Sequence, residues 1–127
     1  MKNPPRPTDS ELEILAVLWG TGPATVRQVY ELICQRRPAQ YSTILKFMQI
    51  MAEKGLVLRD EEQRAHVYRA AKPREWTQQQ LAGHLLERAF SGSAKAMLIG
   101  ALSSRKTSKA ELAELRKLVD AYAREAK

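Results

Sequence analysis

Hydrophobic residues recur at helical spacing in the first part of the chain, and helix-start signals divide them into separate helices. Thr8 and Glu11 have the T-x-x-E spacing of a capping box, in which each side chain bonds the other residue's backbone N–H. Thr25 and Gln28 repeat this arrangement ahead of a second apolar stripe. Pro38 stops the second helix, because the residue before a proline avoids helical backbone angles. The pattern predicts two short helices before this proline.

A third helix and a β-hairpin are expected next. The third helix begins at residue 41 or 42 and runs to residue 54, with Gly55 as its C-cap. Residues 56–59 and 64–70 favour strands, and the polar stretch between them favours a turn. Three helices followed by a hairpin, within about 70 residues, is the order of a winged helix-turn-helix domain.

The second part of the chain is predicted to be entirely helical. Stop and start signals place helices at 73–91, at 93–102 and after a capping box at Ser108. These helices lack the mass for a core of their own, so they fit best against a second copy of the chain. The predicted fold class is mostly α with a small β-hairpin, comprising a winged helix-turn-helix domain (1–72) and a helical dimerisation region (73–127). The expected dimerisation residues are Leu81, Leu85, Phe90, Met97, Leu112, Leu115, Val119 and Tyr122.

The chain is basic, with 21 Lys and Arg against 14 Asp and Glu, a net charge of +7. Residues 1–72 hold 11 basic and 8 acidic side chains, and residues 73–127 hold 10 and 6, so neither part is a basic tail. The charge favours polyanionic partners, although many proteins without such partners are equally basic. No apolar run approaches the roughly 18 residues of a membrane span, and the N-terminus lacks the apolar core of a signal peptide. We expect a cytoplasmic protein with no membrane insertion.

Few residues suit catalysis or metal binding. His66 and His84 are the only histidines, and the chain has no glycine-rich phosphate loop and no G-x-S-x-G motif. The single cysteine, Cys34, excludes an intramolecular disulfide and any multi-cysteine zinc site. Its place beside Ile33 favours a small buried hydrophobic side chain over a reactive thiol. The prediction is a protein that is not an enzyme and that has no cofactor and no metal site.

The narrow polar strip of the third helix carries the main functional signal. Its N-terminal hydroxyl residues lie where free N–H groups and the helix dipole favour an anion, and Lys46 and Gln49 suit guanine and adenine edges or phosphates. In this motif the second helix crosses the DNA backbone, and the hairpin forms a wing with Arg59 as a further basic candidate. The acidic turn at 60–62 argues against the wing tip itself lying on DNA. The alternative is that the strip is only the solvated side of an amphipathic helix. The expected DNA-binding residues are Thr25, Arg27, Tyr41, Ser42, Thr43, Lys46, Gln49, Arg64 and His66.

Four motifs occur in order along the chain: PTDSELEILAVLW at 7–19, YSTILK at 41–46 with EKGLV at 53–57, RAHVYRA at 64–70 and FSGS at 90–93. Together they resemble the penicillinase-repressor family, bacterial winged-helix repressors of β-lactam resistance genes. The resemblance implies a homodimer that binds inverted-repeat operators through its N-terminal domains and dimerises through its C-terminal helices. It also implies release when a membrane sensor with a metalloprotease domain triggers cleavage in the dimerisation region.

The chain departs from the family pattern in three places. Many members carry an Asn-Phe pair at the cleavage point, where this chain has Ile99-Gly100-Ala101-Leu102. Many also place an arginine late in the third helix, where this chain has Gln49-Ile50-Met51, so we expect a different base preference. The copper-responsive branch has cysteine pairs near its C-terminus, whereas this chain has no cysteine after Cys34, so copper control is not expected.

The leading hypothesis is a transcriptional repressor that binds a palindromic operator in double-stranded DNA as a homodimer. Its release is expected to follow a sensor-triggered signal such as proteolysis by a regulatory protease. One alternative is a winged-helix repressor that senses a small molecule in a pocket between its dimer helices. A second alternative is a protein-interaction module whose winged helix docks a protein partner instead of DNA.

Overall fold

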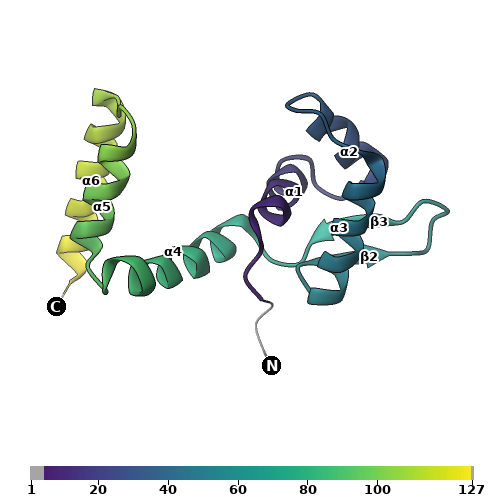
Figure 1. The fold of residues 1–127 in the computed structure, drawn as a ribbon. Helices are drawn as coiled ribbons and strands as arrows, with labels where there is room; N and C mark the ends of the chain where they lie inside the picture. Colours follow the sequence, from purple (N-terminus) through teal and green to yellow (C-terminus); the bar gives the residue numbers. More distant parts are fainter. Residues whose placement is uncertain (1–4, 127) are drawn as a thin grey trace. The chain divides into compact units, whose positions relative to one another are not determined.

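The computed structural model describes residues 5–126, which form two compact units divided between Ala82 and Gly83. The first unit contains α1 (Asp9–Thr21), β1 (Ala24–Thr25), α2 (Val26–Cys34), α3 (Tyr41–Lys54), β2 (Val57–Asp60) and β3 (Val67–Ala70), shown in Figure 1. The division falls within α4 (Arg74–Phe90), and the second unit continues with α5 (Ala94–Ser104) and α6 (Lys109–Glu125). None of the helices formed by these described residues is long and apolar enough to cross a membrane.

The predicted capping residues set the boundaries of the first helices. Thr8 Oγ1 accepts the Glu11 N–H at 3.2 Å, and Glu11 Oε1 accepts the Thr8 N–H at 2.9 Å. The same reciprocal pair forms between Thr25 and Gln28, at 3.2 and 2.8 Å, so both predicted capping boxes are confirmed. Gly55 ends α3 with a φ of +84°, a left-handed conformation that glycine adopts without steric cost.

The sheet has one strand more than the predicted hairpin. Its order is β1-β3-β2 with antiparallel pairing throughout, and β1 pairs Ala24 with Tyr68 and Thr25 with Val67. Two residues are too few to show an alternating pattern, which is why the sequence did not reveal β1. The strand leads directly into α2, and it therefore ties the start of that helix to the hairpin. Figure 1 shows the loop between β2 and β3 extending away from the three helices.

One hydrophobic core fills the first unit between the helices and the sheet. The helix α3 contributes Ile44, Met48 and Met51, which recur at helical spacing and are almost wholly buried. Because these residues face inward, the opposite side of α3 is left exposed to solvent. The largest fully buried side chains of the core are Tyr68, Ile14, Ile33, Ile44, Met48, Met51, Val29 and Val57.

The carboxylate of Glu11 is a buried charge that joins α1 to α3. The residue is 2% exposed, and its two oxygens lie 3.1 and 2.9 Å from the Nζ atom of Lys54. Lys54 occupies the last turn of α3, where the helix dipole favours a cation. Burial alone raises the pKa of Glu11, but the Thr8 N–H and the Lys54 ammonium outweigh it, so the pKa lies below its ordinary value of 4.5.

Replacing Glu11 with Gln tests the ion pair separately from the cap, because a glutamine still accepts the Thr8 N–H. We expect the free energy of unfolding to fall by roughly 1–3 kcal/mol, since Lys54 then loses its charged partner. Urea denaturation followed by circular dichroism measures this change. Glu13→Gln is the matched control, because Glu13 pairs with Arg37 at the surface, at 2.6 Å. An exposed pair contributes about 0–1 kcal/mol, so equal losses in the two variants would contradict the assignment.

The ion pair also predicts a pH dependence of stability. A carboxylate whose pKa is lowered by folding stabilises the protein above its unfolded-state pKa. This contribution is lost as the pH falls through the lower folded-state pKa. We therefore expect the stability difference between the native chain and Glu11→Gln to shrink as the pH is lowered from neutral into the acid range. Denaturation curves at pH values on both sides of 4.5 measure it, and a difference that grows on acidification would be the contrary result.

Candidate nucleic-acid interface

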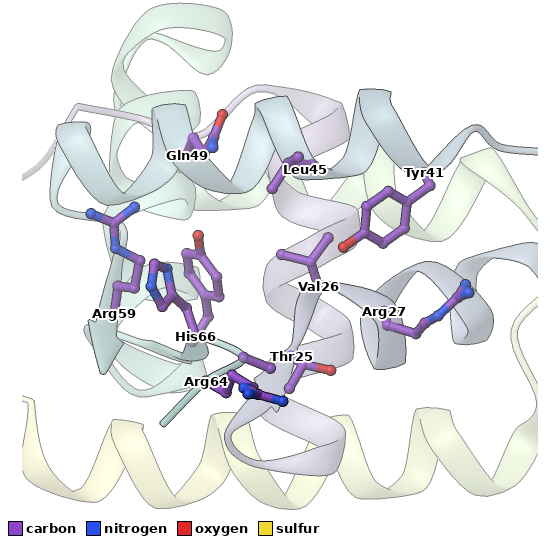
Figure 2. A pocket seen from close by; sticks show the side chains of 11 residues that line it. Thr25, Val26, Arg27, Tyr41, Leu45, Gln49, Arg59, Arg64 and His66 are labelled. Atoms are coloured by element: carbon purple, nitrogen blue, oxygen red, sulfur yellow. The ribbon is translucent and has the colours of Figure 1, made fainter. Parts of the chain in front are cut away.

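A groove of about 280 Å³ lies between the start of α2, the exposed side of α3 and the wing, by which we mean β2, β3 and the loop 61–66. Figure 2 shows the side chains that line it. Six of the predicted DNA-binding residues are among them: Thr25, Arg27, Tyr41, Gln49, Arg64 and His66. The remaining lining residues were not in the predicted set: Val26, Leu45, Arg59, Ala65 and Tyr68.

The groove combines an apolar floor with basic walls. Val26 and Tyr68 are buried, and Leu45 is half-buried. The basic side chains Arg27, Arg59, Arg64 and His66 come from α2 and the wing, and none of the described residues that line the groove carries a carboxylate. Such a surface attracts an anion at its walls and tolerates an apolar group at its floor.

Aromatic contacts hold Arg27 at the edge of this groove. Its guanidinium carbon lies 5.7 Å from the ring centroid of Tyr41, within the range of a cation–π contact. The Tyr41 ring in turn meets Tyr30 edge-on, with centroids 5.6 Å apart and an interplanar angle of 78°. Arg27, on α2, is therefore placed over the first residue of α3.

Thr25 caps α2 with its hydroxyl oxygen, and its hydroxyl hydrogen can still donate a hydrogen bond. Its hydroxyl oxygen accepts the Gln28 N–H, which uses one lone pair. The hydroxyl hydrogen remains able to donate to an anion in the groove. The capping role and the predicted contact are therefore compatible in the same side chain.

Arg59 is the basic residue that the predicted set omitted. It lies opposite Tyr68 in the pairing of β2 with β3, and Figure 2 shows its side chain rising from the wing toward the helix that carries Gln49. A hydrogen bond with Tyr68 and the charge of Glu61 raise the pKa of Arg59 above its ordinary value. Alternation along β2 from the buried Val57 places Arg59 on the same face of the strand, and this signal could have identified it.

The other predicted residues of α3 lie outside the groove. Ser42, Thr43 and Lys46 are exposed to solvent, but they are not among the lining residues. The groove-facing stripe is instead Tyr41, Leu45 and Gln49, which recur at intervals of four. The exposed side of α3 thus has one edge toward the groove and another open to solvent.

Cys34 is exposed, so the interpretation as a small buried hydrophobic side chain is wrong. The core positions of α2 are Val26, Val29 and Ile33, and the next residue along the helix turns away from that face. The Cys34 thiol lies 3.7 Å from the carbonyl oxygen of Ala39. Within the described residues there is no group of three or more His, Cys, Asp or Glu that could hold a metal ion.

The second unit has no buried residue among those described, 83–126, and it exposes many apolar side chains. Of the predicted dimerisation residues, Leu85, Leu112, Val119 and Tyr122 are exposed. Phe90, Met97 and Leu115 are half-buried, and so is Leu81 in the first-unit part of α4. Three further large apolar side chains that the prediction omitted are also exposed: Leu98, Ile99 and Leu118.

Comparison with known proteins gives consistent matches. The sequence profile of the penicillinase repressor family matches residues 7–121. Proteins described as transcriptional regulator BlaI, from two strains of Mycobacterium tuberculosis, are 37% identical over 93 residues, which cover 72% of this chain and 67% of theirs. An uncharacterized 16.5 kDa protein of Latilactobacillus sakei is 27% identical over 117 residues, covering 91% of this chain and 80% of its own.

A solved structure matches the first part of the fold. The solution structure of the DNA binding domain of the repressor BlaI superposes with a TM-score of 0.52 at 24% identity. The match covers 58% of this chain and 90% of that one. At this identity the similarity concerns the fold alone, and it confirms the predicted class, a mostly helical chain with a winged helix-turn-helix domain.

Proposed function

This chain belongs to the penicillinase repressor family and is a DNA-binding transcriptional repressor. We propose that it binds a palindromic operator as a homodimer. The observation that carries the proposal is the groove with basic walls between α3 and the wing. Family membership agrees with the prediction that the chain is not an enzyme. It also favours DNA over a protein partner as the ligand of the winged helix.

The basic walls of the groove and the exposed side of α3 have different roles in this proposal. Arg27, Arg64 and the hydroxyl of Thr25 contact backbone phosphates, which position the domain without reading sequence. Lys46 and Gln49 reach base edges in the major groove, where lysine suits guanine and glutamine suits adenine. The apolar Leu45, one turn before Gln49 on the groove-facing stripe of α3, suits a thymine methyl group.

Two alanine variants distinguish these roles. Lys46→Ala should weaken binding to the operator by roughly 1–3 kcal/mol and leave binding to a scrambled duplex much less affected. Arg27→Ala should weaken binding to both duplexes by a similar factor and reduce the salt dependence by about one unit of log–log slope. Fluorescence anisotropy with DNA from upstream of the gene, at several salt concentrations, measures both. Unchanged affinity and salt slope in both variants would refute the assignment.

The dimer is proposed to form through residues 73–127, with residues 1–72 binding DNA. On α6, Leu112, Leu115, Val119 and Tyr122 recur at alternating intervals of three and four, the spacing of a helix-to-helix seam. A stripe of this kind on a unit whose described residues, 83–126, include none that is buried is expected to pack against another apolar surface. A second copy provides an identical stripe.

Placing a charge in this stripe should separate the two copies. We expect Val119→Glu to halve the molar mass measured by light scattering at micromolar concentration. Operator affinity should fall by a factor on the order of a hundred, because the two half-sites are no longer bound by linked domains. The control is Ala113→Glu, which makes the same charge change at an exposed position away from the stripe. Loss of the dimer in both variants, or in neither, would contradict the proposed seam.

Release from the operator is proposed to follow a sensor-triggered signal such as proteolysis. The segment Ile99–Leu102 lies inside α5, so cleavage there requires local unfolding of the helix. The alternative of direct sensing predicts a small-molecule-dependent rise in melting temperature with the chain intact.

A further inference from the structure

One carboxylate on the wing faces two side chains of the groove. Glu61 Oε2 lies 3.4 Å from Arg59 Nη2, and Glu61 Oε1 lies 3.9 Å from His66 Nε2. Among the described residues, it is the acidic side chain that pairs with Arg59 and lies close to His66 in the groove lining. Glu53 borders the surface next to Arg59, but it forms no ion pair there.

The loop geometry sets the position of Glu61. The side chain of Asp60 accepts the Glu62 N–H at 2.9 Å, which closes a local turn around Glu61. The Glu61 side chain forms no backbone hydrogen bond of this kind with the described residues, and it is 60% exposed. Its pairing with Arg59 is therefore a contact at the surface, which contributes little energy and is easily exchanged.

The backbone of Arg59 is held in place by the sheet, whereas the Glu61 carboxylate contacts its guanidinium. Its backbone pairs with that of Tyr68 across the sheet, and Tyr68 is 1% exposed. Figure 2 shows the guanidinium on the side of the wing that faces α3. A guanidinium presents a planar fork of donors that matches a phosphate as well as it matches a carboxylate.

From this arrangement we infer that Glu61 competes with DNA phosphate for Arg59 and thereby weakens the binding of duplex DNA. The inference rests on the proposed function, since it concerns the same groove. A phosphate that approaches Arg59 displaces the Glu61 carboxylate, and part of the phosphate contact is offset by the lost ion pair. Because phosphate contacts carry no sequence information, the effect applies to operator and non-operator DNA alike.

The test compares Glu61→Gln with Glu62→Gln in the full chain. Both variants remove one negative charge from the same loop, but the Glu62 side chain forms no ion pair with the described residues. We expect Glu61→Gln to bind the upstream duplex and a scrambled duplex about threefold more tightly than Glu62→Gln does, the size of one surface ion pair. The slope of the salt dependence should be nearly the same in the two variants, because Arg59 neutralises one phosphate in both once the Glu61 carboxylate has been displaced.

The Arg59→Gln background provides the second comparison. If Glu61 acts through Arg59, then Glu61→Gln and Glu62→Gln bind equally once Arg59 has been replaced. Equal binding of the two variants with Arg59 present would overturn the inference. Weaker binding by Glu61→Gln would also overturn it, because Glu61 would then position Arg59 for DNA. Native protein that binds neither duplex at low salt would instead refute the proposed function itself.

Discussion

The buried link between Glu11 and Lys54 is the constraint on which the placement of α3 depends. Hydrophobic contacts hold α3 in the core, but the hydrophobic effect that drives them is not directional. The Glu11 carboxylate is directional, because it must receive both the Thr8 N–H and the Lys54 ammonium to remain charged while buried. The first turn of α1 and the last turn of α3 are therefore fixed together, and the groove-facing stripe of α3 is fixed with them.

The basic charge of the first unit divides into structural and available parts. Lys54 and Arg37 are paired with Glu11 and Glu13 of α1, so they contribute to the fold and little to the potential outside it. Arg27 and Arg64 line the groove without a carboxylate partner among the described residues. Arg59 is intermediate between the paired and the unpaired cations, because its partner, the Glu61 carboxylate, is exposed and can be displaced. The distribution of the acids therefore decides which cations remain available at the groove, and net charge alone does not.

Local rules predicted most of the fold, because its signals are contained in short stretches. The two capping boxes, the Gly55 cap and the order of elements needed only neighbouring residues. The strand β1 was missed because its two residues are ordered by pairing with β3, a contact distant in sequence. The place of Arg59 in the groove lining depends in the same way on its register opposite Tyr68. Cys34 was misjudged because one further residue along α2 turns the side chain from core to solvent.

The two units differ in what their packing requires, and this difference bears on the proposed dimer. The first unit encloses a complete core, whereas the described part of the second has no buried residue. Burial of the apolar stripe on α6 therefore needs a surface from outside the unit. If that surface is a second copy, ordering of the second unit and dimerisation are one equilibrium that depends on chain concentration. A signal that shortens or opens the second unit then acts on DNA binding without touching the groove, because it removes the linkage between two half-site contacts.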